Sequence, residues 1–133
     1  MSRSNIDMIA ALPELIPDRL DEARDNFSDD FVWTYINPLL PQIEGDYSGV
    51  DGLKEFFHKL GELTGGTFGV RVKEAYPLGD ELVVAHAAPG MALDGETFET
   101  DAAVVWRIVD GKIKAAWDIP AVYTVRPDGE GDA

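Results

Sequence analysis

Apolar and polar residues alternate along the second half of the chain, in runs that turn signals separate. These runs are residues 67–76, 81–88, 96–109 and 111–118. A period of two is typical of half-buried β-strands. Asp94-Gly95 and Asp110-Gly111 stand between apolar runs, where tight hairpin turns need positive φ at both central residues. The pattern predicts a curved antiparallel sheet whose last strand ends in Trp117-Asp118.

The first half predicts helices with a strand between them. Residues 6–27 favour helix, and Pro13 and Pro17 divide them into two short helices, because proline is best tolerated in a first turn. We expect the second of these helices over about residues 18–26. Aromatic and β-branched residues at 31–36 predict a strand, and a proline-marked loop follows from 37 to 45.

A longer helix is predicted from about Val50. Ser48 and Asp51 have the spacing of a capping box, and Thr64-Gly65-Gly66 ends the helix. Apolar residues recur at the spacing of a helix that packs one face on a sheet. They are Leu53, Phe56, Phe57, Leu60 and Leu63.

Helices followed by one curved antiparallel sheet give an α+β layout, with the helices packed on the concave face of the sheet. A chain of 133 residues buries a single core, so we expect one domain over residues 1–125. Residues 126–133 hold proline, glycine and acids with no apolar anchor, and they predict a disordered acidic tail.

The expected strand 96–109 has two faces that are both apolar in their second halves. One face carries Phe98, Thr100, Ala102, Val104, Trp106 and Ile108, and the other carries Glu99, Asp101, Ala103, Val105, Arg107 and Val109. Neither face suits full exposure to water. We therefore expect one face to line a pocket and the other to meet a second copy of the chain in a homodimer.

Composition argues against several classes of partner. Eleven basic and 25 acidic residues give a net charge of −14, which repels nucleic-acid phosphates and anionic membrane surfaces. The chain has no cysteine, and its two histidines, one on the exposed face of the predicted helix, form no metal-ligand cluster. Signal-peptide and membrane-span patterns are absent from the sequence, so we expect a cytoplasmic protein that needs no metal or cofactor.

Four segments of the chain resemble one known family. They are Asp29-Asp30-Phe31-Val32-Trp33, the helix entry Tyr47-Ser48-Gly49-Val50-Asp51-Gly52, the hairpin from Val105-Trp106-Arg107 to Ile113, and the closing Trp117-Asp118. They are similar to the SnoaL-like branch of the NTF2-like (nuclear transport factor 2) superfamily over about residues 18–120. The resemblance implies an NTF2-like cone and a dimer. It leaves the reaction open, because this scaffold carries isomerases, polyketide cyclases, dehydratases, epoxide hydrolases and non-catalytic ligand binders.

The resemblance disfavours two of these activities. Ketosteroid isomerases of the superfamily use a carboxylate base before a proline and an acid before the last hairpin, and these positions fall at Asn37 and Ala103. Asparagine cannot accept the proton, and alanine cannot donate to an enolate. The Asp–Arg–Asp set of the limonene-epoxide hydrolases keeps one acid at Asp118, while its other positions fall near His86 and Ala88.

Asp118 is the acid that remains after this comparison. It stands where SnoaL-like polyketide cyclases carry the acid thought to move a proton during aldol ring closure. That role needs a pKa raised by an apolar pocket, which Trp33, Trp106 and Trp117 could supply. Packing in the core is the alternative, and the favoured one, for these three tryptophans. The alternative is that Asp118 caps the strand end or pairs with Lys114.

Other side chains are candidates for the same pocket. His86 lies in an apolar strand, and histidine is the residue type suited to proton exchange near neutral pH, which makes it a second candidate; a hydrogen-bonded core histidine is the alternative. The expected ligand-binding residues are Trp33, Tyr35, Asn37, Phe57, Asp101, Ala103, Trp106 and Trp117.

Three functions are compatible with these residues. The first is a cofactor-free isomerase, cyclase or lyase-type enzyme, in which Asp118 and His86 exchange protons with a small apolar molecule that carries a carbonyl group. The second is a protein that only binds such a molecule. The third is a domain whose sheet binds another protein.

Overall fold

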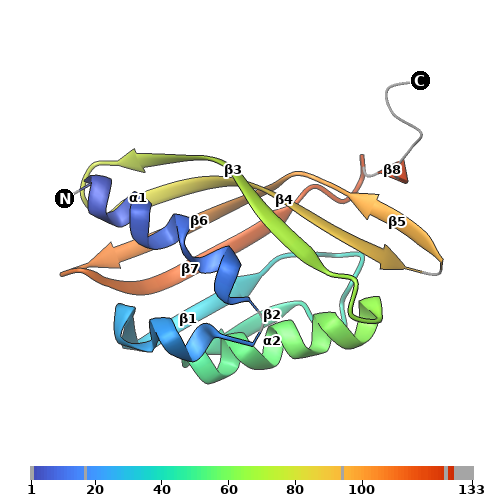
Figure 1. Cartoon of the computed structure of the whole chain (residues 1–133), viewed down its shortest axis with the longest axis horizontal. Coiled ribbons are helices and arrows are strands. Elements are labelled where there is room, and N and C mark those ends of the chain that lie inside the picture. The colour runs from blue at the N-terminus through green and yellow to red at the C-terminus, as the bar shows by residue number, and fades with distance from the viewer. Residues whose placement is uncertain (1, 17, 94, 125, 128–133) are drawn as a thin grey trace.

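A curved, open β-sheet with helices across its concave face forms the framework of the chain (Figure 1). The structure is a computed structural model that describes residues 2–16, 18–93, 95–124 and 126–127. Within these residues the sheet has eight strands. The α+β class and the placement of the helices are those expected from the sequence.

The N-terminal helices differ in detail from the prediction. They are α1 (Ser2–Ala10), the 3-10 helix η1 (Leu12–Leu15) and the 3-10 helix η2 (Leu20–Asn26). Pro13 lies in the first turn of η1, where its missing N–H costs no hydrogen bond. Figure 1 shows α1 crossing in front of the sheet, and it contacts β3 (Gly69–Leu78) and β4 (Leu82–Leu93).

Helix α2 (Gly49–Thr64) lies along β1 (Phe27–Tyr35) and β2 (Gly45–Ser48) in Figure 1. It ends as expected at Gly65, which has a φ of 63°. The predicted capping box is wrong: the Ser48 side chain makes no cap hydrogen bond, and Asp51 instead accepts a hydrogen bond of 2.8 Å from Arg24 of η2. The buried stripe of α2 includes four of the five predicted apolar residues, and the fifth, Leu63, is partly buried. The buried residues are Val50, Leu53, Phe56, Phe57, Leu60 and Thr64.

The second half of the chain forms the predicted strands with two changes. The strands after β4 are β5 (Glu96–Glu99), β6 (Ala102–Val109), β7 (Lys112–Pro120) and β8 (Arg126–Pro127). The expected strand 96–109 is thus divided into β5 and β6. The expected disordered tail begins with β8, which pairs with β5, and the remainder of that prediction, residues 128–133, lies outside the described residues.

The sheet order is β2-β1-β7-β6-β4-β5-β8, and β3 pairs along β4. All of these pairs are antiparallel except β1 with β7, which is parallel. The expectation of an antiparallel sheet throughout is therefore wrong at this one pair. The parallel pair is possible because β1 and β7 are joined by most of the chain, and parallel neighbours need a long crossover rather than a tight turn.

The turn between β6 and β7 has the predicted geometry, and the strand that follows contains a bulge. Asp110 and Gly111 both have positive φ, at 53° and 77°. Arg107 pairs with Ala115 and Ile108 with Ile113, so the register shifts at Lys114. A bulge of this kind reverses the face on which later side chains lie.

No helix in the described part of the chain is long and apolar enough to cross a membrane.

Candidate active site

The inner face of the sheet is built from cross-strand rows of side chains. Because partners in register lie side by side on one face, the pairings place Tyr35 of β1, Asp118 of β7, Val104 of β6 and Ala85 of β4 in one row. The neighbouring row runs through Trp33, Ala116, Trp106 and Val83. Each row combines large and small side chains. The small ones leave space between the sheet and the helices.

That space is a cavity of about 400 Å³. Helices η1 and α2, the loop after β1 and the segment after β7 close it around the sheet, and most of its lining is apolar. Leu12, Leu39, Phe57, Leu60 and Val122 are lining residues from these elements. The lining side chains with oxygen or nitrogen atoms are Trp33, Tyr35, Asn37, Thr100, Trp106 and Asp118. The cavity is therefore suited to an apolar molecule with few polar groups.

Asp118 is the ionisable acid of this lining. Burial raises the pKa of its carboxyl to about 7, because surrounding protein has replaced the water that would solvate the charge. The residue is only partly buried, and it lines the cavity, so the carboxyl is next to the space that a ligand would occupy. Its side chain makes no hydrogen bond or ion pair with any described residue.

The alternative roles considered for Asp118 are wrong. Lys114 bonds Asp30 at 2.6 Å instead, because the bulge at Lys114 removes the shared face that simple alternation implies. The Asp118 carboxyl has no hydrogen-bond partner among the described residues, whereas the backbone oxygen accepts a 3.0 Å hydrogen bond from the Ile36 N–H. The carboxyl is thus left to the cavity.

Tyr35 and Asn37 lie beside Asp118 and form a buried hydrogen bond. The Asn37 amide nitrogen donates to the Tyr35 hydroxyl oxygen at 2.9 Å. Burial raises the pKa of Tyr35 to about 12; the bond from Asn37 opposes this rise, and the charge of Asp118 adds to it. Tyr35 therefore keeps its proton at neutral pH.

Two tryptophans and Phe57 form the aromatic part of the wall. The ring centroids of Trp33 and Trp106 are 5.7 Å apart, and those of Trp33 and Phe57 are 6.0 Å apart. The indole N–H groups of Trp33 and Trp106 have no acceptor among the described residues. The structure thus brings six of the predicted site residues to one cavity: Trp33, Tyr35, Asn37, Phe57, Trp106 and Asp118.

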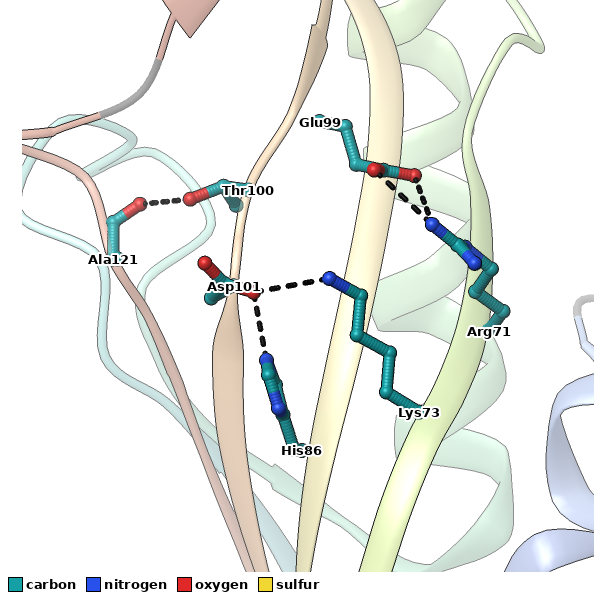
Figure 2. Close-up of polar contacts among 7 residues, drawn as sticks. All are labelled: Arg71, Lys73, His86, Glu99, Thr100, Asp101 and Ala121. Atoms are coloured by element: carbon teal, nitrogen blue, oxygen red, sulfur yellow. Dashed lines mark hydrogen bonds and ion pairs between the residues drawn. The ribbon is translucent and has the colours of Figure 1, made fainter. Parts of the chain in front are cut away.

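The other four predicted site residues, His86, Asp101, Ala103 and Trp117, do not line the cavity. Figure 2 shows His86 and Lys73 directed at Asp101: the His86 Nε2 is 2.7 Å and the Lys73 Nζ 3.6 Å from Asp101 Oδ1. Arg71 and Glu99 pair beside them. The bond from His86 is the main cause that lowers the pKa of Asp101.

The expectation that these four residues share the pocket with Asp118 is therefore wrong, and so is the alternative that His86 is a core residue. Strand alternation explains the error. Ala85 and Ala87 point into the cavity, so His86 between them points outward. Trp117 likewise lies next to Asp118 in sequence but on the opposite face, with its ring 5.5 Å from the Arg107 guanidinium. The apolar surround of Asp118 comes from other residues.

Some cavity residues were not named as site residues from the sequence. Ala102 and Val104 were placed on the same face as Trp106, and Ala85 and Ala87 could have been found by extending that face across the paired strands. Leu39, Leu40, Val122 and the residues of α1 and η1 carry no such signal, because their approach depends on tertiary packing. Groups of three or more His, Asp or Glu side chains that could hold a metal ion do not occur in the described ranges.

Comparison with solved structures identifies the class of fold. A protein with a ketosteroid isomerase-like fold from Catenulispora acidiphila, solved in complex with trimethylamine, is 16% identical over 84% of this chain and 83% of its own, with a TM-score of 0.67. A putative SnoaL-like polyketide cyclase from Jannaschia sp. CCS1 is 16% identical over 90% of this chain and 86% of its own, with a TM-score of 0.73. The fold is therefore that of the NTF2-like and ketosteroid isomerase-like proteins.

The family follows from the sequence itself. Residues 10–116 match the SnoaL-like domain, so the chain belongs to the SnoaL-like domain family. TerC, whose crystal structure was obtained by co-crystallisation with polyporic acid, is 26% identical over 89% of this chain and 92% of its own, with a TM-score of 0.72. Curated proteins give no match.

Proposed function

We propose that this protein is an enzyme that moves a proton on a small, mostly apolar molecule with a carbonyl group, and that Asp118 is its acid–base group. One observation carries the proposal: a carboxyl without a partner among the described residues, with a pKa raised to about 7 by burial, lines an apolar cavity of about 400 Å³. An acid–base catalyst works best when its pKa is near the operating pH, since both of its forms are then available.

The composition of the cavity supports this class of substrate. A volume of about 400 Å³ lies in the range of small-molecule sites. Aromatic side chains line one side, and the polar groups near Asp118 are few, which favours a ring compound with an oxygen at one end. Some cyclase, isomerase and lyase-type reactions begin with removal of a proton from the carbon next to a carbonyl group.

The relatives support the same proposal at a coarser level. The likeness to a putative SnoaL-like polyketide cyclase supports the fold that such chemistry uses. The co-crystallisation of TerC with polyporic acid makes that compound a natural first ligand to test on this chain.

The test is proton exchange at a ketone. Cyclohexanone, acetophenone, α-tetralone and polyporic acid are first screened for binding by quenching of tryptophan fluorescence, which is informative because Trp33 and Trp106 line the cavity. Ketones that bind are then incubated with the protein in D₂O, and deuterium uptake next to the carbonyl is followed by NMR. We expect exchange that rises with pH and levels off above about pH 7, because the carboxylate is the base.

Asp118→Asn should lower this exchange roughly 10²–10⁴-fold without preventing binding, since the amide keeps the shape and removes the proton chemistry. Asp29→Asn is the matched control, because it removes an exposed acid of β1 and leaves the cavity unchanged. Binding of every probe without exchange would instead favour a protein that only holds its ligand.

We also propose that the protein is a homodimer formed through the outer face of the sheet. Val109 of β6 and Ile119 of β7 are 39% and 44% exposed on this face, and Tyr76 of β3 is 50% exposed. Exposed apolar side chains spread along one sheet face support an interface there. The polar group around Asp101 lies on the same face, so the interface would be partly charged.

A further inference from the structure

The hydroxyl group of Tyr35 has a proton without an acceptor among the residues that the structure describes. Tyr35 lines the cavity and is 4% exposed. The hydrogen bond of its oxygen is the one that it accepts from Asn37. Within the described residues the hydroxyl has no acceptor for its own proton. A buried O–H normally finds an acceptor, so this group is a candidate to bind a ligand oxygen.

The direction of the Tyr35–Asn37 bond follows from the network around it. The Asn37 Oδ1 accepts a hydrogen bond of 3.0 Å from the backbone N–H of Leu39, and an N–H can only be bonded by the oxygen of an amide side chain. The amide nitrogen must therefore be the atom that faces Tyr35, where it donates. The phenol oxygen is an acceptor in this bond, and its proton is directed elsewhere.

Asn37, which orients the Tyr35 hydroxyl, is itself held in place by hydrogen bonds. The Asn37 backbone N–H donates to Glu44 Oε2 at 2.8 Å, and its backbone oxygen accepts from Leu40 N–H at 3.1 Å. With the bond from Leu39, these contacts fix the loop that follows β1. A donor fixed before the ligand arrives loses little entropy on binding, which is what a catalytic site requires.

Tyr35 and Asp118 are also neighbours across the sheet. They are register partners of the parallel pair β1 and β7, and adjacent strands lie about 4.8 Å apart. Their side chains therefore emerge side by side on the cavity face. A carbonyl oxygen and the carbon next to it lie closer together than two adjacent strands do, so a small substrate between these side chains can contact both groups.

We propose that the Tyr35 hydroxyl donates a hydrogen bond to the carbonyl oxygen of the substrate while Asp118 exchanges a proton at the neighbouring carbon. This inference rests on the proposed function. It assigns the substrate class more narrowly, as a ketone or quinone-like molecule whose reactive C–H is next to its carbonyl. Asn37 is a positioning residue, because it acts through Tyr35.

The proton transfer balances without a further reactant. The Asp118 carboxylate takes a proton from the carbon beside the carbonyl, so that a C–H bond breaks and an O–H bond forms. The electron pair of the C–H bond becomes a C=C bond, and negative charge develops on the oxygen. The Tyr35 O–H stabilises that charge, and the Asn37 amide supports any charge passed to the phenol oxygen. Return of the proton to the same or another carbon completes exchange or isomerisation.

Infrared spectroscopy of a bound ketone tests this assignment directly. Hydrogen bonding lowers the C=O stretching frequency of acetophenone or α-tetralone, and we expect that lowering in the natural protein and its loss in Tyr35→Phe. Tyr47→Phe is the matched control, because Tyr47 is also a buried tyrosine of this sheet but donates its proton to the Ile43 backbone oxygen at 2.6 Å. An unchanged C=O frequency in Tyr35→Phe would overturn the assignment.

A measurement on the natural sequence covers the case in which Tyr35→Phe does not fold. The chain has four tyrosines, which can be labelled with ¹³C at Cζ. Removal of Tyr47, Tyr76 and Tyr123 one at a time assigns three resonances and leaves that of Tyr35. We expect ketone binding to shift the Tyr35 resonance most, because its hydroxyl gains an acceptor. A Tyr35 resonance unmoved by a bound ketone would contradict the proposal.

Exchange rates separate this inference from the proposed function. Tyr35→Phe should lower ketone exchange roughly 10²–10³-fold, as loss of an oxyanion donor does, while ketone affinity falls only several-fold. If Asp118→Asn abolishes exchange and Tyr35→Phe leaves it unchanged, the role of Tyr35 is refuted and the proposed function is retained. Absence of exchange in the natural protein, with the infrared shift still dependent on Tyr35, would refute the catalysis and retain Tyr35 as a binding group.

Discussion

Asp118 should make the stability of the protein depend on pH in a direction opposite to that of most acids. Its pKa is about 7 in the folded protein, against an ordinary value of 3.8. Between these values the folded protein holds a proton that the unfolded chain has released. Stability therefore falls as pH rises from about 4 to about 7, and the loss is complete above that range.

The magnitude follows from the same two pKa values. Their difference corresponds to ~4 kcal/mol at 25 °C, and this is an upper limit because water that enters the cavity would solvate the charge. Asp118→Asn carries no charge at any pH. We expect the variant to be more stable than the natural protein by up to ~4 kcal/mol at pH 8.5, and to differ little from it at pH 4.

Denaturant unfolding at several pH values measures this difference. Other acids, such as Asp21, Asp30 and Asp101, have lowered pKa values, so their contribution to the stability of the protein is lost as the pH falls. These acids are common to both proteins, so their effect cancels in the comparison. Asp29→Asn controls for the removal of one negative charge from a chain of net charge −14. A stability difference that is the same at pH 4 and pH 8.5 would refute the burial of the Asp118 charge.

Three further predictions concern packing and assembly. Gly52→Ala should destabilise the fold by about 1–3 kcal/mol in denaturant melts, because a Cβ at Gly52 would lie 2.9 Å from the Tyr47 backbone carbonyl carbon. Gly61→Ala in the same helix is the control: its Cβ would meet nothing within 4 Å, so the change should be neutral or stabilising. Equal effects of the two substitutions would contradict the close approach at Gly52. Phe56→Ala should cost about 3–5 kcal/mol, since Phe56 is fully buried between α2 and the sheet, and a loss below about 0.5 kcal/mol would show that the helix packs differently. Light scattering should give a mass of about 29 kDa, twice the 14.6 kDa of one chain, and Ile119→Arg should reduce it to that of a monomer; a monomer mass for the natural protein at micromolar concentration would exclude the dimer.

The sheet was predictable from sequence because its signals are local. Period-two alternation assigned Ala102, Val104 and Trp106 to one face, and this face does line the cavity. Asp110-Gly111 predicted the β6–β7 turn through the positive φ that both residues adopt. The apolar stripe of α2 likewise depends only on the spacing of neighbouring residues along one helix.

The missed features depend on contacts between distant parts of the chain. The polar segment Gly45–Ser48 forms β2 only because β1 offers it an edge, and the β1–β7 parallel pair joins residues far apart in sequence. The bulge at Lys114 requires knowledge of the register with β6. For the same reason the bond that Asn37 donates to Tyr35, on which the site depends, could not be read from their spacing of two.

His86 and Trp117 show a different source of error. Each lies next to an inward residue, and placing both neighbours in one pocket ignored the strict alternation of a strand. The aromatic surround expected from Trp117 comes instead from Trp33 and Trp106, which lie in the row beside Asp118. Strand parity separates Trp117 from Asp118 by sequence position alone, whereas the exclusion of His86 also needs the β4–β6 register, which pairs it with Ala103.

The small residues of the inner face have a consequence for how this scaffold can change its ligand. Ala85, Ala87 and Ala102 line the cavity with single methyl groups, and their strands are held together by backbone bonds that do not depend on side-chain size. Replacement of one of these alanines by valine or leucine would reduce the volume of the cavity. The outer face would be unaffected, because the neighbouring side chains point away. The size of the cavity and the surface of the outer face can therefore change independently, one residue at a time, on opposite sides of the same two strands.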